Sequence, residues 1–150
     1  LSEHFDVHFA KLMVMHHQGA IDMVRIELAK GKDDRLITLA RKIMDRKAEE
    51  IKVLETNVSH HKPKAADNVT DKELKESISK MMNGMKNIEI KGNTDKEFAQ
   101  MMLLHLRSAV EMGAQEVIQG HHVQLKLMAR DMIREDKKVM EEIENWLSDK

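Results

Sequence analysis

The chain contains an internal repeat, and this repeat constrains its fold more than any other feature of the sequence. When the sequence is shifted by 89 positions, residues 9–58 align with residues 98–147 without a gap, and 12 of the 50 aligned pairs are identical. The identical pairs are Phe9/Phe98, Ala10/Ala99, Met13/Met102, His16/His105, Ala20/Ala109, Met23/Met112, Glu27/Glu116, Gly31/Gly120, Leu36/Leu125, Ala40/Ala129, Arg41/Arg130 and Glu55/Glu144. Shared helical patterning raises such a score, but it does not explain a matched histidine, glutamate and glycine. Self-similarity at a fixed offset indicates a protein built from two copies of one unit.

Each copy is predicted to form two helices joined by a glycine. Apolar residues recur with the 3.6-residue period of a helix over about 2–30, 33–59, 70–90, 94–119 and 121–147, and no segment alternates as a strand does. Gly31 and Gly120 are placed to end the first helix of each copy. Pro63 cannot continue a helix, so a break is expected after the second one.

Two such hairpins predict an all-α domain. One hairpin cannot bury its apolar stripe alone, whereas two that face each other form an antiparallel four-helix bundle. We therefore expect one domain over residues 1–150, with repeats at about 1–61 and 70–148 that a polar linker at 62–69 joins. The short helix at about 70–90 is expected to pack on an end or side of the bundle. A pseudo-two-fold axis between the copies is expected to bring His16 and His105 together in its middle.

Charge and hydropathy exclude several classes of function. The formal net charge is −1 and no basic face is segregated, so nucleic-acid binding is not expected. No apolar run approaches the roughly 20 residues that a membrane-spanning helix needs. The chain has no cysteine. A protein that handles a soft metal outside the cytosol is better served by thioethers than by thiols, because thiols oxidise more readily.

The matched histidines lie among residues that suit a soft metal ion. On a helical wheel Met13, His16 and Met23 share one narrow face, and the second copy repeats it with His105 between its own two methionines. Thioether and neutral imidazole ligands suit Cu(I) and discriminate against hard cations. Because only neutral histidine binds a metal, affinity is expected to fall on acidification.

A third set of methionines lies outside the repeat. Met81 or Met82 shares a helical face with Met85, so two thioethers are available together. This set is expected either to supply further ligands or to deliver metal from outside.

The same methionines and histidines can also be explained as core residues, without any metal. Methionine fills irregular gaps in helical cores, and a stripe of methionines at helical spacing is more often packing than a site. A buried histidine is more often hydrogen-bonded within the core than bound to a metal, and Glu27 is a candidate partner for it. The alternative function is therefore a metal-free helical module for protein interaction.

Enzymatic chemistry is not expected. A di-iron bundle needs four inward carboxylates and a Glu-x-x-His motif on each of two helices. The sequence has no Glu-x-x-His motif, and Glu50 is matched by Val139 in the second copy. Nucleophile motifs and glycine-rich phosphate loops are also absent from the sequence.

The stretch from Phe9 to Met23, with its consecutive residues His16, His17 and Gln18, resembles the signature of the DUF305 family. The family pattern is a Phe, a Met and then His-His-Gln-x-Ala-Ile-x-Met. The resemblance extends through the second helix, and a degenerate second copy covers 98–147. That copy departs from the pattern at Leu106 and Arg107, which replace the second His and the Gln.

The resemblance implies a ferritin-like helical bundle that is usually exported, and some members bind copper in the periplasm and contribute to copper tolerance. The ligands that it implies are Met13, His16, His17, Met23, Met102, His105 and Met112, with Met81 and Met85 as further candidates.

We therefore expect a protein that sequesters or transfers Cu(I), with other transition metals as alternatives. A periplasmic or extracellular location is expected, with an export signal that preceded Leu1. Its partners are expected to be the metal ion and either a metal-transfer protein or a second copy of the chain.

Overall fold

The computed structural model describes residues 2–58 and 72–150 of the chain. Over these residues it consists of five helices and no strand, which confirms the predicted all-α class. The helices are α1 (Ser2–Lys30), α2 (Asp34–Val58), α3 (Lys72–Lys86), α4 (Thr94–Gln119) and α5 (Val123–Ser148). None of these helices is both long and apolar enough to cross a membrane. The linker predicted at 62–69 lies outside the described residues, so the repeat boundaries stay a prediction.

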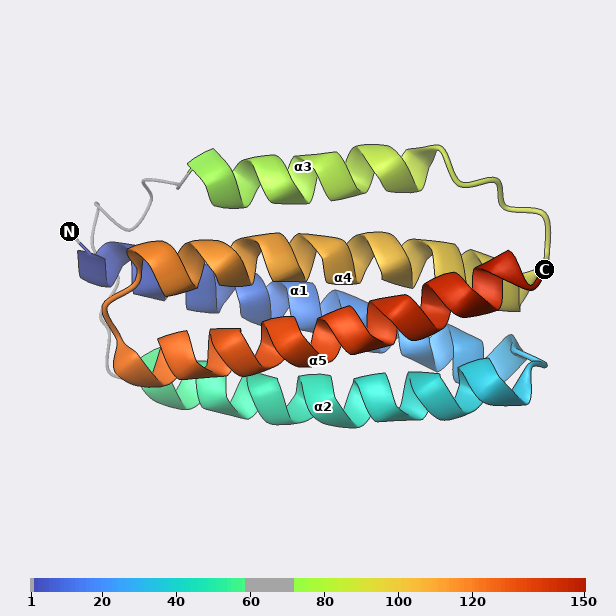
Figure 1. Ribbon diagram of the computed structural model, residues 1–150, viewed down its shortest axis with the longest axis horizontal. Helices are drawn as coiled ribbons and strands as arrows, with labels where there is room; N and C mark the ends of the chain where they lie inside the picture. The colour runs from blue at the N-terminus through green and yellow to red at the C-terminus, as the bar shows by residue number, and fades with distance from the viewer. Residues whose placement is uncertain (1, 59–71) are drawn as a thin grey trace.

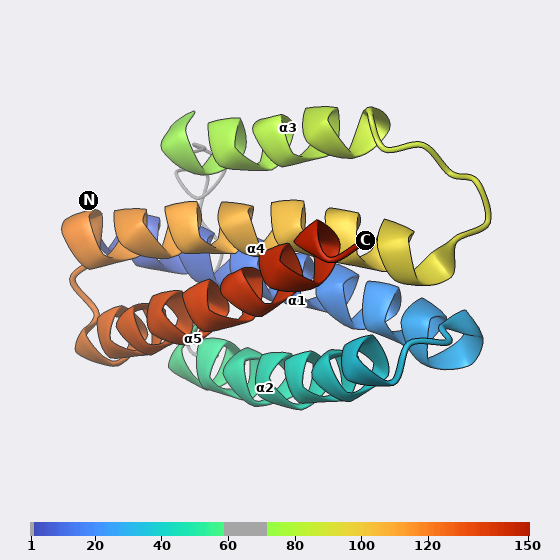
Figure 2. The same ribbon diagram turned by 45° about the vertical axis from the view of Figure 1, so that its right-hand side comes forward.

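The helices form an antiparallel four-helix bundle with one helix added outside it. Helices α1 and α2 make one hairpin, and α4 and α5 make the other (Figure 1). The hairpins meet with α1 packed against α4, while α2 runs beside α5. Helix α3 packs on α4, on the side away from the bundle (Figures 1 and 2). The predicted position of the short helix, on one side of the bundle, is confirmed.

Two predicted helix boundaries differ from the structure. Helix α3 ends at Lys86 and not near Ile90, because the chain turns there, with the N–H of Asn87 bonded to the Gly84 carbonyl at 3.2 Å. Helix α5 begins at Val123 and not at His121. His122 is its N-cap residue, and its Nδ1 accepts a hydrogen bond from the backbone N–H of Leu125 at 3.4 Å.

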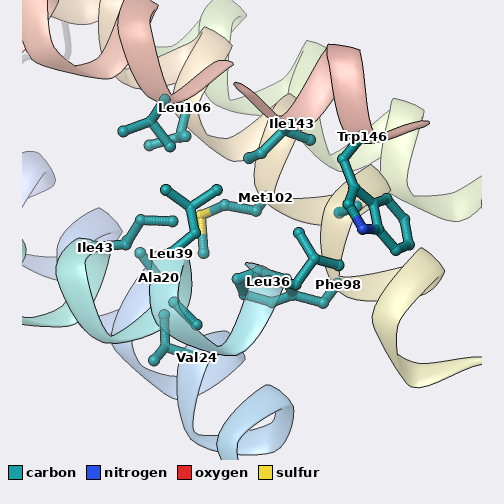
Figure 3. Packing of buried hydrophobic residues seen from close by; sticks show 13 residues of the cluster. Ala20, Val24, Leu36, Leu39, Ile43, Phe98, Met102, Leu106, Ile143 and Trp146 are labelled. Carbon is teal, nitrogen blue, oxygen red and sulfur yellow. The ribbon is translucent and has the colours of Figure 1, made fainter. Parts of the chain in front are cut away.

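The core consists of two clusters of buried side chains. Cluster 1, seen in Figure 3, contains Ala20, Val24, Leu36, Leu39, Ala40, Ile43, Phe98, Ala99, Met102, Leu106, Val139, Ile143 and Trp146. Cluster 2 contains Phe5, Phe9, Ala10, Met13, Leu54, Leu74, Ala109, Met112, Leu125, Met128, Ala129 and Met132. Each cluster draws on both hairpins, so neither hairpin has a core of its own. This is the arrangement expected for a unit that buries its apolar face only against a second copy.

Two glycines inside the long helices differ in the space around them, which predicts different effects of adding a methyl group. A Cβ on Gly19 of α1 would lie 3.4 Å from His105 Cε1, an ordinary contact. A Cβ on Gly113 of α4 would lie 2.8 Å from Met132 Cε and 3.2 Å from Ile133 Cγ1.

We expect Gly19→Ala to raise the free energy of unfolding by about 0.5–1 kcal/mol, because alanine loses less backbone entropy in a helix than glycine does. Gly113→Ala should raise it by less, since its methyl group crowds two side chains. Urea unfolding of both variants measures the difference, and equal stabilisation would contradict the packing around the two glycines.

Candidate metal centre

His16 and His105 form a reciprocal pair where α1 crosses α4. Their rings are stacked, with centroids 3.6 Å apart and an interplanar angle of 10°. The Nε2–H of His16 donates to the backbone carbonyl of His105 at 2.9 Å, and the Nε2–H of His105 donates to the carbonyl of His16 at 2.6 Å. A carbonyl can only accept, so each ring carries its proton on Nε2 and its lone pair on Nδ1. The prediction that the pseudo-two-fold axis brings these histidines together is confirmed.

Both rings of this pair are neutral at physiological pH. Burial and the charge of Lys47 lower the pKa of His16 to about 4, although the hydrogen bond with the backbone of His105 opposes this shift. Burial and the adjacent His16 lower the pKa of His105 to about 2. Neutral imidazole is the form that binds a metal, so the pair needs no deprotonation before it coordinates one.

His17 belongs to a separate buried network of charged groups. Its Nε2–H donates to Glu50 Oε1 at 2.7 Å. The Lys47 ammonium donates to the same Glu50 oxygen at 3.1 Å and to both carboxylate oxygens of Asp136 at 2.8 and 2.9 Å. Arg46 adds a more exposed contact to Glu50 at 3.3 Å. Burial, and then Lys47, lowers the pKa of His17 well below its usual value, so this ring is also neutral.

The second hairpin does not repeat this network. The positions that correspond to His17 and Glu50 hold Leu106 and Val139, both buried in cluster 1. Lys47 and Asp136 are themselves partners under the 89-residue offset, so this ion pair joins equivalent positions of the two hairpins. This charged network is therefore confined to the first hairpin and Asp136, which faces it.

The methionines of the predicted site flank the histidine pair on both sides. Met13 and Met112 are fully buried in cluster 2, whereas Met102 is fully buried in cluster 1 with Met23 packed against that cluster. Each cluster thus receives one of these thioethers from α1 and one from α4. The four methionines lie one to two turns from a histidine on the same helix, so their role as ligands beside the histidine pair stays a prediction.

Met81 and Met85 do not join this site. They lie on α3, which packs on the outer side of α4. There Ser77 of α3 bonds Ser108 of α4, with the two hydroxyl oxygens 2.9 Å apart, while His105 faces α1. Both methionines are partly buried and their neighbour Met82 is 53% exposed. Of the two roles predicted for this set, a separate one near the surface is the one compatible with the structure.

The predicted bond between Glu27 and the buried histidine is wrong, because His16 and His105 bond each other's backbone and His17 bonds Glu50. The network of Lys47, Glu50 and Asp136 was not predicted. One signal for that network exists, because Lys47 and Asp136 occupy equivalent positions with opposite charges.

The available donors define what this interior can hold. The Nδ1 atoms of His17 and His105 are buried and make no hydrogen bond with the described residues. No three His, Asp or Glu side chains among the described residues converge to hold a metal ion. A metal in this interior would therefore depend on imidazole Nδ1 atoms and thioether sulfurs together. This donor set is soft and carries no charge, so it fits a soft monovalent ion and not a hard divalent one.

The buried ion pair predicts a large loss of stability when one partner is removed. Asp136→Ala leaves the Lys47 ammonium with Glu50 alone in the core, and we expect a cost of about 3–5 kcal/mol in the free energy of unfolding. Adding Lys47→Met should recover much of this loss, because the unbalanced buried charge is then gone. Urea unfolding at neutral pH measures both variants, and a double variant no more stable than Asp136→Ala would contradict the explanation.

The histidine pair predicts a loss of stability in acid. Its folded-state pKa values lie below the ordinary value of 6.5, so the unfolded chain binds more protons below pH 6.5. The stability that the neutral rings contribute is present above pH 6.5 and is lost as the pH falls through about 4 for His16 and about 2 for His105. Relative to a His16→Asn, His105→Asn variant, the wild type should lose about 2 kcal/mol between pH 6 and 5. Parallel unfolding curves for the two proteins over this range would contradict the pKa assignment.

Solved structures with the same fold superpose on almost the whole chain. A crystal structure of a DUF305 fragment from Deinococcus radiodurans superposes with a TM-score of 0.74 at 16% identity, covering 97% of each chain. CopM in the Cu(I)-bound form superposes with a TM-score of 0.74 at 25% identity, covering 96% of each chain. CopM in the Cu(II)-bound form gives a TM-score of 0.75 at 24% identity, with the same coverage.

No curated protein matches this chain. The profile of the family described as "Domain of unknown function (DUF305)" matches residues 6–147. This match includes both hairpins, α3, the stacked histidines and the buried charged network. The chain therefore belongs to the DUF305 family.

Proposed function

We propose that this protein binds Cu(I) as cargo in the interior of the bundle and sequesters it or passes it to a partner. The proposal rests on the buried Nδ1 atoms of His17 and His105, which make no hydrogen bond with the described residues, and on the thioethers present in the two neighbouring clusters. Thioether and imidazole are the ligands that favour Cu(I) over hard cations. The fold that this chain shares with CopM, a protein solved in a Cu(I)-bound form, supports the same conclusion.

The hydrogen bonds of the histidines are compatible with coordination. Each Nε2–H is held by a carbonyl or a carboxylate, as is usual for the second nitrogen of a histidine that binds a metal. Coordination through Nδ1 then requires no bond of the ring to break. Glu50 and His17 correspond to Val139 and Leu106 in the second hairpin, so the proposed binding is not equivalent in the two hairpins.

The route by which copper reaches the buried methionines gives α3 a role. Met13, Met102 and Met112 have no exposed surface, so copper reaches them only when helices separate. The α3 methionines lie nearer the surface, with Met82 exposed. We assign them to capture of the ion before it enters the bundle. Because the chain has no thiol to oxidise, this chemistry suits the periplasm, where such binding contributes to copper tolerance.

A Cu(I) titration under anaerobic conditions, against a competing chromogenic chelator, tests the proposal. Met-to-Leu exchange removes the thioether and nearly keeps the volume, so the fold should survive. A variant with Met13, Met23, Met102 and Met112 changed to Leu should lose at least about tenfold in Cu(I) affinity. The control changes Met128 and Met132, two cluster 2 methionines on α5, and should bind as the wild type does.

Two further variants locate the ligands. His17→Leu with Glu50→Val places the residues of the second hairpin in the first, leaves Lys47 paired with Asp136, and should weaken binding. Changing Met81, Met82 and Met85 to Leu should slow loading and leave the affinity nearly unchanged. If all variants bind as the wild type does, the histidines and methionines are packing residues, and the metal-free interaction module is the better explanation.

A further inference from the structure

Two aspartates tie each hairpin to the loop of the other, at opposite ends of the bundle. Asp95 at the start of α4 accepts hydrogen bonds from the backbone N–H groups of Lys32 and Asp33, between α1 and α2, at 3.1 and 3.2 Å. Asp6 near the start of α1 accepts from the N–H groups of His121 and His122, between α4 and α5, at 3.0–3.2 Å. Asp6 and Asp95 are themselves related by the 89-residue offset.

A fully buried glutamate lies against each aspartate. The carboxyl group of Glu27 lies within hydrogen-bonding reach of Asp95, and that of Glu116 lies within reach of Asp6; neither glutamate has exposed surface. Each carboxyl group folds over the glycine four residues later, where a Cβ on Gly31 or Gly120 would collide with it. These glycines are therefore needed for space. Gly120 itself has φ −73°, so no left-handed backbone is involved there.

The protonation state of each pair of carboxyl groups is limited by the hydrogen-bond donors around it. No donor from the described residues reaches any of the four oxygens of Glu27 and Glu116. Two carboxyl groups hydrogen-bond each other only when one of them keeps its proton. If both were ionised, two like charges would lie close together, one of them on a fully buried side chain.

We propose that each Glu–Asp pair is a proton-held latch, in which one shared proton joins the glutamate near the end of one hairpin's first helix to the aspartate, on the other hairpin, that accepts from its interhelix loop. Loss of the two protons at alkaline pH releases both ends of the bundle. This inference does not depend on copper, because neither latch includes a candidate ligand.

The charges around each latch place the proton on the glutamate. Burial, then the hydrogen bond and charge of Asp95, then the charge of Asp33, raise the pKa of Glu27 to about 8. Burial works against ionisation of Asp95, but its hydrogen bonds from Glu27 and the loop N–H groups, with the charge of Lys32, lower its pKa on balance. Asp33 in turn contacts Lys150 at 3.9 Å. The charged aspartate is what the loop N–H groups require.

The second latch has the same arrangement with different neighbours. Burial, then the hydrogen bond and charge of Asp6, raise the pKa of Glu116 to about 9, and Lys126 opposes this shift. Both latches therefore release their protons in alkaline solution.

The direction of the pH effect follows from these pKa values. Unfolded glutamate ionises near pH 4.5, so above that pH the folded protein holds one proton per latch that the unfolded chain does not. The stability that the latches contribute is fully present below pH 4.5 and is lost as the pH rises through about 8 and 9. Over this window the unfolding equilibrium constant rises about tenfold per pH unit for each latch.

Urea unfolding of the full chain between pH 6 and pH 10 tests the latches. Glu27→Gln with Glu116→Gln keeps the shape and donates an amide N–H to each aspartate, but it cannot ionise. From pH 6 to pH 7 the unfolding constant of the wild type should rise about a hundredfold more than that of this variant. The control is Glu55→Gln with Glu144→Gln, the other matched glutamate pair of the repeat, which is exposed and should follow the wild type. A Glu27→Gln, Glu116→Gln variant with the same pH profile as the wild type would overturn the proposal.

A second measurement needs no variant. In wild-type protein labelled with ¹³C at the glutamate carboxyl carbon, two resonances should stay at the protonated position at pH 7 and move only in alkaline solution. If every glutamate resonance has moved by pH 6, the latches do not exist, whatever the unfolding data show.

Discussion

The contact between α1 and α4 depends on one interaction, the exchange of hydrogen bonds between His16 and His105. Each ring donates to a backbone carbonyl of the opposite helix, and the rings stack between the two helices. A helix carbonyl has a second lone pair, so it can accept this bond without giving up its bond within the helix. Ala20 and Ala109, fully buried one turn farther along each helix, let the backbones approach closely enough for it. The hydrogen bonds thus fix the separation of α1 and α4, and the two clusters pack on either side of this crossing.

The same interaction limits how the histidines can serve a metal. Because Nε2–H holds the helices together, only Nδ1 remains for coordination. Metal binding and helix packing therefore use different atoms of one ring and do not compete. A buried imidazole with one nitrogen fixed by a hydrogen bond is also held in a single tautomer and orientation, which reduces the entropy lost on binding.

The repeat in the sequence predicted the five helices, the bundle and the meeting of His16 with His105. It did not predict the partners of the buried polar groups, and Glu27 shows why. A helical wheel reports which face a residue lies on, but not how far along the helix it is. Glu27 is eleven residues beyond His16, which is about 16 Å along the axis, so it reaches the end of the bundle and not its middle. For the same reason the amphipathic pattern of α3 predicted a buried face, but not that α4 would cover it.

Residue pairs that meet across the pseudo-two-fold axis explain why the two copies differ at some buried positions and are identical at others. At such an axis a residue meets its own counterpart, so two identical copies would place lysine against lysine or aspartate against aspartate. His16 and His105 could stay identical because each bonds the other's backbone, which every residue provides. Lys47 and Asp136 also meet across the axis, and their side chains bond only because they differ. Because that pair carries opposite charges, Glu50 shares the Lys47 ammonium and bonds His17 in the first hairpin, with no counterpart in the second. The asymmetry of the candidate site thus follows from a requirement at the axis: equivalent charged side chains that touch each other in the core must carry opposite charges.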